Sequence, residues 1–181
     1  MNIQDPYAKY REYPKIPYKI IELLLKDERA EELWKLLKYN EPDAWKKPNL
    51  TLAEKTAMIY NGEEHQENYQ VFLDFTMDDS VYTENTYLRI YPLTVVPTNR
   101  TTGICTINLE VFSHAKINHL SNYTTRVDDI IQILLEVLNG AEVSNMGCLY
   151  FDNSRSRDNK ITSIGSKPYK GKILTMSLNM G

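Results

Sequence analysis

Two different hydrophobic periods follow one another between residues 104 and 138, and together they limit the architectures open to this chain. Residues 104–112 alternate between apolar and polar side chains, which is typical of a strand with one buried face. Residues 127–138 repeat their apolar side chains every three or four positions, which predicts an amphipathic helix. A sheet with one apolar face needs such a helix to cover it, so the pair predicts an α+β layer. The helix stripe consists of Val127, Ile130, Ile131, Leu134, Leu135, Val137 and Leu138, and the strand face that we expect it to cover carries Ile107, Leu109 and Val111.

Four other segments have strand-like patterns, and their order along the chain places the helix between them. They span residues 69–75, 86–91, 147–152 and 172–178. The helix is expected to begin after the capping residue Thr125 and to end at Asn139–Gly140. Residues 68–181 are therefore predicted to form an α+β domain, with a mostly antiparallel sheet of about five strands covered by one long amphipathic helix.

Residues 17–62 have the pattern of an N-terminal helical segment that precedes the sheet. Pro17 suits the first turn of a helix, and apolar side chains then recur at helical spacing. Thr51 and Glu54 form the pattern of a capping box, in which two side chains satisfy the free backbone amides at a helix start. Gly62 suits the left-handed residue that follows a helix, so the last helix of this segment is expected to run to about Asn61.

Residues 1–16 lack a regular period, and we interpret them as an extended N-terminal arm. Because such a segment buries little surface of its own, it is expected to contact a neighbouring chain rather than to complete its own core. Tyrosine is enriched where protein surfaces meet, and the chain has 13 tyrosines against 4 phenylalanines. The alternative is that many of the tyrosines line sheet faces. The arm residues assigned to an assembly interface are Tyr7, Tyr10 and Tyr13.

Charge is distributed unevenly along the chain. The connection 153–171 holds five basic residues and one acidic residue, whereas residues 51–98 hold two basic and eight acidic residues. A long connection inside a compact domain is functional or mobile. Opposite charges of this kind are expected if copies of the chain meet head to side. The alternative is two solvated surfaces without a partner.

The residue types of common active sites are present, but their spacing does not favour catalysis. Ser113 and His114 are adjacent on a predicted strand, where they would point to opposite faces. The three histidines have no spacing that would bring them together on a metal ion. The pairs Asp78–Asp79 and Asp128–Asp129 suit a turn and a helix start. No glycine-rich phosphate-binding loop occurs, and the two cysteines lie in apolar runs as expected for buried free thiols. We therefore expect no enzyme, no cofactor and no metal site.

Composition places the chain among soluble globular proteins. It has 181 residues and a formal net charge of -3, which gives no overall reason to expect nucleic-acid binding. No apolar run approaches the length that spans a bilayer. Residues 1–6 lack the basic start and the apolar stretch of a signal peptide. We therefore expect no membrane contact and a chain that is made and kept in a cytoplasm.

Five segments carry a resemblance to a known protein family: residues 86–91, 105–112, 126–131, 147–152 and 169–175. In their pattern and order they resemble the tail-terminator and neck proteins of long-tailed bacteriophages. The resemblance covers residues 68–181 and implies strands, a long helix on one face and two more strands. It implies a ring, typically a hexamer, at the head-proximal end of the tail or within the neck. The protein would then be a virion component, assembled in the host cytoplasm, that contacts other neck and tail proteins and has no catalytic residues.

The resemblance gives the basic connection two uses. In a ring through which DNA passes, Arg155, Arg157 and Lys160 would meet phosphates without reading bases. Lys167 and Lys170 lie closer to the final strand, where they are better placed to meet the acidic section of a neighbouring copy. The alternative function is a small cytoplasmic regulatory or inhibitory module that binds one other protein.

Overall fold

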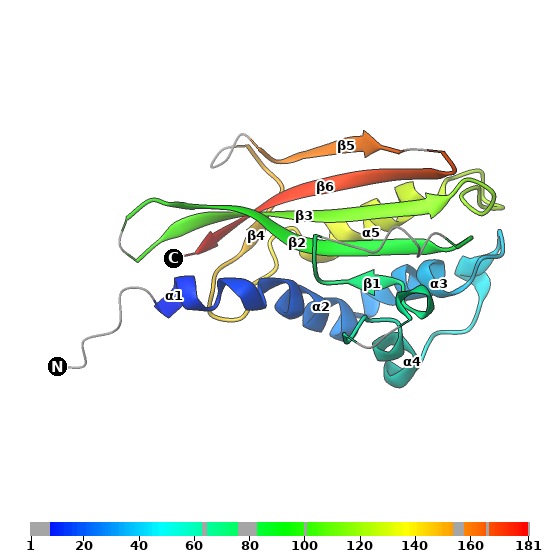
Figure 1. Cartoon of the computed structure of the whole chain (residues 1–181), viewed down its shortest axis with the longest axis horizontal. Coiled ribbons are helices and arrows are strands. Elements are labelled where there is room, and N and C mark those ends of the chain that lie inside the picture. The colour runs from blue at the N-terminus through cyan, green and yellow to red at the C-terminus, as the bar shows by residue number, and fades with distance from the viewer. Residues whose placement is uncertain are drawn as a thin grey trace.

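The computed structural model describes residues 8–62, 65–75, 83–99, 101–153, 158–165 and 167–180, which form a six-stranded sheet with helices against one face (Figure 1). The strand order is β1-β2-β3-β6-β4, and β5 also pairs with β6. β1 runs parallel to β2, and the other neighbouring pairs are antiparallel. The strands are β1 (Val71–Phe72), β2 (Thr86–Pro97), β3 (Gly103–His114), β4 (Leu149–Tyr150), β5 (Lys160–Ile164) and β6 (Tyr169–Met180).

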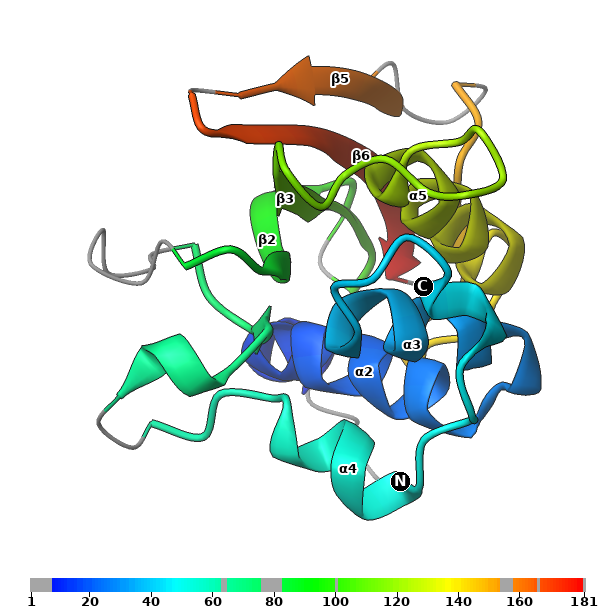
Figure 2. The ribbon, with the colours of Figure 1, turned by 90° about the vertical axis from the view of Figure 1, so that its right-hand side faces the viewer.

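The helices form a second layer, in which α2, α3 and α5 lie on the same side of the sheet (Figure 2). α4 lies beyond α2 and α3, on their far side from the sheet. The helices are α1 (Ala8–Arg11), α2 (Ile16–Lys26), α3 (Glu31–Lys38), α4 (Leu52–Ala57) and α5 (Arg126–Leu138). Short 3-10 turns lie between them or beside them: η1 (Tyr13–Lys15), η2 (Glu28–Ala30), η3 (Ala44–Lys46) and η4 (Gln66–Asn68).

The core lies between β2, β3 and β6 and the helices. Leu109 of β3 is paired with Ile90 of β2 and Leu174 of β6, and all three side chains are fully buried. Because side chains alternate along a strand, each of the three strands presents one apolar set to the helices. The predicted stripe of α5 packs into this core, although Leu135 is only partly buried. The α+β fold and the covering of β3 by α5 are therefore confirmed.

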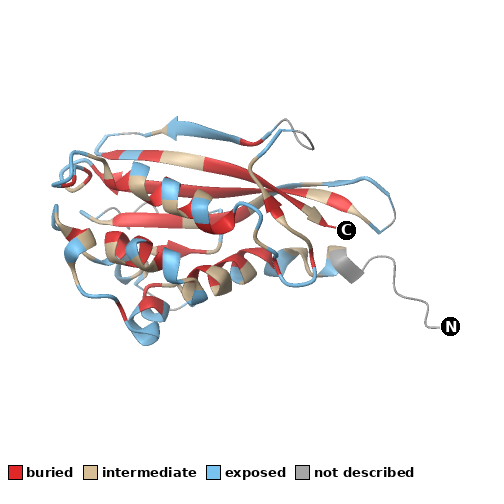
Figure 3. Cartoon of the chain, turned by 180° about the vertical axis from the view of Figure 1, so that it is seen from behind, coloured by how far each residue is buried: buried red, intermediate tan, exposed pale blue. Residues whose placement is uncertain are grey.

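The prediction that one helix alone covers the sheet is wrong. α2 and α3 both pack on β2, α3 also packs on α5, and their apolar sides belong to the same core (Figure 3). Trp34 of α3 is fully buried, and its indole N–H donates to the carbonyl of Leu24 at 2.9 Å. One helix is about 10 Å wide, whereas strands lie about 4.8 Å apart, so one helix covers only two strands. The N-terminal helices are needed to cover the rest of the sheet.

Residues 8–15 are helical, although the sequence predicts an extended arm there. Tyr10 and Tyr13 pack against the chain's own core. The Tyr10 hydroxyl donates to the carbonyl of Thr102 at 2.5 Å, at the tip of the β2–β3 hairpin. The expectation that the arm does not contribute to the core of its own chain is therefore wrong for Tyr10 and Tyr13, because their rings make apolar contacts within the chain. Tyr7 lies outside the described residues.

Two predicted elements are shorter in the structure. The strand expected over residues 69–75 is confined to Val71–Phe72, and α4 ends at Ala57 rather than near Asn61. The cause is a bridge between Ile59 and Val71, because it uses backbone groups that a longer helix would need for its own hydrogen bonds. The chain after α4 therefore turns back beside β1 instead of continuing as a helix.

Arg126 is the first residue of α5, and its side chain is fully buried. Within the described part of the chain, its guanidinium donates hydrogen bonds to backbone carbonyl groups only. The guanidinium donates to Leu36 at 2.7 Å, Tyr39 at 2.6 Å, Glu41 at 3.0 Å and Ile117 at 3.1 Å. The first two carbonyls belong to the end of α3, where a helix has no backbone donors left for them. Burial lowers the pKa of Arg126 to about 10, which leaves the group charged at neutral pH.

The position of Leu134 at the centre of the α5 stripe gives a first test of this core. Leu134 is fully buried, so Leu134→Ala should lower the free energy of unfolding by about 2–5 kcal/mol. Urea denaturation measures the loss, and Gln132→Ala on the exposed side of the same helix serves as the matched control. Equal stability of the two variants would mean that α5 packs through another face.

Replacement of Arg126 tests the connection between α3 and α5. Arg126→Met should lower the free energy of unfolding by about 3 kcal/mol or more, because several desolvated carbonyls lose a charged donor. Arg29→Met is the control, since Arg29 pairs with Asp27 at the surface, where water screens such pairs and they contribute little to stability. Hydrogen exchange should also rise at the end of α3 in Arg126→Met alone. If both variants unfold at the same urea concentration, the hydrogen bonds of Arg126 do not hold α3 and α5 together.

Candidate assembly surfaces

An apolar groove of about 1250 Å³ lies between α2, α4 and the chain around β1. Tyr18 and Leu52 line it and are 53% and 63% exposed. Contiguous exposed apolar surface of this kind marks sites of interaction. The groove could not be predicted from the sequence, because its walls come from segments that are distant from one another along the chain. The aliphatic side chains that line it include Ile21, Leu25, Ile59 and Leu73.

The position of α4 keeps this groove open. The capping box predicted for Thr51 and Glu54 is confirmed, and it sets the start of the helix. Lys55 is buried on the inner side of α4, where it forms an ion pair with Glu31 of α3. This contact holds α4 against α3, while Ala53 and Ala57, on the side of α4 that faces away from Lys55, line the groove together with Leu52.

β5 provides a free sheet edge on a different part of the molecule. It pairs with β6 on one side, and its other side pairs with no described strand. Four of its five residues are exposed, and Ile161 is 41% exposed. The connection 153–171, in which the sequence patterns predict no strand, therefore contains one at residues 160–164. A signal was present, since β-branched Ile161, Thr162 and Ile164 follow one another here, but the many charges of the connection outweighed it.

The opposite edge of the sheet is protected. β1 covers β2 only at Leu88 and Arg89. Beyond these residues β2 contains Pro92 and Pro97, and the pairing with β3 shifts register between Pro92 and Thr94. Proline has no N–H to donate, and an irregular edge does not pair readily with another strand. The two edges of the sheet therefore differ in their capacity to accept a further strand.

The basic residues assigned by sequence lie partly on the free edge. Lys160 is on β5, Lys167 is in the turn that follows β5, and Lys170 is near the start of β6. All three are exposed, and none of them forms an ion pair with a described residue. Arg155 and Arg157 lie outside the described residues. The DNA-facing role of Arg155, Arg157 and Lys160 therefore stays a prediction.

The acidic residues of the section 51–98 are exposed where they are described. Glu54 caps α4, Glu67 pairs with His65, and Glu84 pairs with Lys116. Glu54 belongs to α4, which lies on the opposite side of the molecule from β5 (Figure 1). Glu63, Glu64, Asp78 and Asp79 lie outside the described residues. Glu54 on α4 therefore lies on the opposite side of the subunit from the basic edge at β5, whereas Glu84 lies beside the end of β3, where the His114 N–H donates to the carbonyl of the adjacent Asn85.

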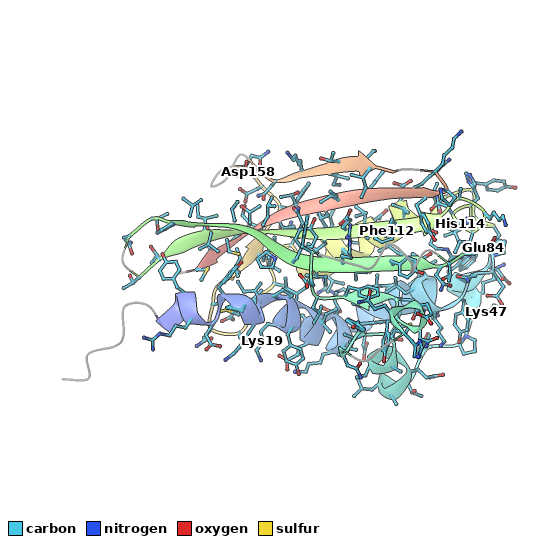
Figure 4. The ribbon with its side chains drawn as sticks, in the orientation of Figure 1. Lys19, Lys47, Glu84, Phe112, His114 and Asp158 are labelled. Carbon is cyan, nitrogen blue, oxygen red and sulfur yellow. The ribbon has the colours of Figure 1, made fainter. Side chains whose placement is uncertain are left out.

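The sheet face away from the helices carries an aromatic cluster at one end (Figure 4). Phe112 packs against Tyr87 with ring centroids 5.2 Å apart and against Tyr169 at 5.8 Å. His114 stands edge-on to the Tyr169 ring at 5.4 Å. The Ser113 hydroxyl bonds instead to Thr86 of β2. Ser113 and His114 are therefore engaged with different partners, as their alternation on a strand predicts.

The centre of the same face is polar, and its groups bond to one another. Thr175 donates to the side-chain oxygen of Asn108 at 2.9 Å, and Ser177 donates to that of Asn159 at 2.8 Å. Both pairs are buried. Asp158 lies at the other end of the molecule from His114 (Figure 4) and borders a small cavity of about 400 Å³ over this network. Buried polar groups with partners of this kind stabilise the fold.

The remaining groups that often carry chemistry have ordinary surroundings. Burial raises the pKa of the Cys105 thiol to about 12. Cys148 is also a free thiol, but it is only partly buried, which corrects the prediction that both are buried. Among the described residues, no group of three or more His, Cys, Asp or Glu side chains is placed to hold a metal ion. No helix in the described part of the chain has both the length and the apolar character to cross a membrane.

Comparison with known proteins links most of this fold to one family. The model of the YomW family matches residues 30–178, which extend from the end of η2 through α5 into β6. α1 and α2 precede the matched region. No curated protein sequence matches the chain. The chain therefore belongs to the YomW family, whose name is that of a protein of the Bacillus SPbeta prophage.

Proposed function

We propose that the chain is a structural protein of a tailed bacteriophage particle, where copies assemble into a ring that joins tail to head. One observation carries the proposal: two unlike surfaces lie on opposite sides of the subunit. One is the free basic edge at β5, and the other is the apolar groove beside the acidic residues of α4 and η4. A contact between unlike surfaces is heterologous, and repetition of such a contact closes into a ring when the rotation permits.

Three further features support this role. The family is phage-associated, and the order of strands and helix resembles that of tail-terminator and neck proteins. The Ser113 hydroxyl bonds to Thr86, the His114 ring contacts Tyr169 and the Cys105 thiol is buried, and these surroundings fit a structural role. The ring would contact other neck and tail proteins in the virion, and it would meet passing DNA through Arg155, Arg157 and Lys160.

The alternative is a small regulatory or inhibitory protein that binds one host protein. The exposed groove fits such a role, because a single apolar groove can accept a segment of any partner. The two roles differ in stoichiometry and in location. A regulator acts as a monomer or a small complex outside the particle, whereas a neck protein is a permanent part of it.

Deletion of the gene from its phage tests the proposed function. Without the protein, filled heads and separate tails should accumulate, and electron microscopy of lysates would count them. Mass spectrometry of purified wild-type particles should find several copies per virion. Complementation with the variant that replaces Arg155, Arg157 and Lys160 by Gln should restore joined particles but lower the fraction that retains DNA. Normal particle yield without the gene, together with absence of the protein from virions, would contradict the proposal.

Charge reversal at the free edge tests the contact between copies. Lys167→Glu combined with Lys170→Glu should weaken self-association, because exposed cations that face an acidic neighbour would become repulsive. Sedimentation velocity measures the oligomer, and the wild-type oligomer should itself weaken as salt rises, since screening acts over about 8–10 Å at physiological ionic strength. Lys15→Glu combined with Lys46→Glu is the charge-matched control, because both lysines are exposed and neither belongs to β5 or α4. Equal assembly of the two double variants would remove Lys167 and Lys170 from the interface.

A further inference from the structure

The outer edge of β5 has the regular backbone that a further strand requires (Figure 1). β5 pairs with β6 in unbroken antiparallel register from Lys160 to Ile164, without the register shift that interrupts the pairing of β2. Alternate residues of a strand turn their N–H and C=O groups to opposite sides, so an edge strand satisfies half of these groups in its own sheet. The other half form a row of donors and acceptors along β5, where no described strand pairs with them.

Side chains at this edge are accessible on both faces of the sheet. Lys160 and Thr162 border the cavity of about 400 Å³ over the outer face. Ser163 borders a second cavity, of about 280 Å³, which also involves Val127 at the start of α5. Ile161 pairs with Leu174 of β6, a core residue, yet it is 41% exposed because the sheet extends past its covering helix here. A strand added to β5 would therefore find a polar, basic surface on one face and an apolar contact on the other.

The charge of the edge is positive. Three of the lysines that border it form no ion pair with a described residue, and the fourth, Lys172, pairs with Asp128. Asp158 is the other carboxylate that lines either cavity, so the cations outnumber the anions. The other three lysines are Lys160, Lys167 and Lys170, and all are exposed.

This charge discriminates between the strands that can pair with β5. Lysines on an edge strand oppose pairing with a second copy of the same edge, because like charges then lie side by side. The same lysines attract a strand of opposite charge. Among the described strands of this chain, the one acidic residue is Glu110 of β3, which is buried and paired with Arg89. The described part of the chain therefore has no acidic strand to offer to β5 of another copy.

We propose that β5 is a docking edge for an extended acidic segment of a different protein, which adds to the sheet as an antiparallel strand. Backbone hydrogen bonds along residues 160–164 supply affinity, and side chains select the sequence. Acidic side chains on the outer face meet Lys160, and apolar side chains on the other face cover Ile161. The inference goes beyond the proposed function, because the contact between copies is assigned to Lys167 and Lys170, which lie outside β5.

A designed peptide tests the charge and the place of the contact. The probe is a fluorescent synthetic peptide that alternates glutamate and valine, titrated by anisotropy into the full chain. It should bind, and binding should weaken as salt rises. A peptide with glutamine in place of glutamate should bind at least tenfold more weakly. Lys160→Glu should weaken binding of the first peptide about tenfold, whereas the matched control Lys46→Glu should not, since Lys46 is equally exposed but lies in η3.

Backbone methylation separates strand addition from simple charge attraction. Two further peptides carry N-methyl groups, one on its glutamates and the other on its valines. In an added strand only one of these sets of amides points to β5, so one methylated peptide should lose binding and the other should keep it. Binding of the parent peptide should also slow amide hydrogen exchange at alternate residues between 160 and 164, as measured by NMR.

Four results would overturn the inference. They are absence of binding, equal binding by the two methylated peptides, equal effects of Lys160→Glu and Lys46→Glu, and slowed exchange confined to another part of the chain. Slow exchange at alternate residues of β5 without peptide, lost when the protein is diluted to a monomer, would show that a second copy occupies the edge, which also overturns it. None of these measurements requires a ring or a virion. Failure of the peptide to bind would therefore remove the docking edge, and the gene deletion would still decide the proposed function separately.

Discussion

One buried guanidinium joins the two parts of the helical layer. Arg126 starts α5, and its donors reach the carbonyl groups at the end of α3 and in the loop that follows. These carbonyls end a helix whose other side covers β2, so the positive charge also opposes the negative end of the α3 dipole. Elsewhere α2 and α3 pack against the sheet mainly through apolar contacts. Such contacts have little directional preference, so they would not fix the angle between α3 and α5.

The groove depends on the same joint through a short chain of contacts. Arg126 sets the position of α3, and Glu31 at the start of α3 holds Lys55 of α4. α4 is thus attached to α3 by an ionic contact, while apolar side chains of α2 and α4 line the groove between them. An apolar surface between two helices would ordinarily close on itself. Here polar anchors on the inner side of α4 keep Leu52 exposed at the groove.

Local patterns in the sequence were sufficient for the elements whose stability is local. The caps at Thr51 and Thr125 and the alternation around Leu109 predict helix starts and a buried strand, and the structure has them. The groove could not be predicted, since α2, α4 and β1 meet there only through tertiary packing. β5 could not be recognised, because the basic residues of the connection 153–171 are typical of a solvated loop, although Ile161 and its neighbours have strand propensity. The role of Arg126 could not be predicted either. The sequence does not show the backbone carbonyl groups that surround its guanidinium, and without them an arginine at the start of a helix is expected to be solvated.

The unequal edges of the sheet restrict the ways in which copies can meet. A symmetric dimer formed through one sheet edge would use the same strand twice, and β5 is the described edge that is regular enough for it. Such pairing would bring Lys160 and Lys170 of two copies close together, where like charges repel. The same lysines are attracted to a surface of opposite charge, which this subunit presents beside α4 on its other side. Electrostatics therefore disfavours the closed dimer and favours the unlike contact, and only the unlike contact can continue from subunit to subunit around a ring.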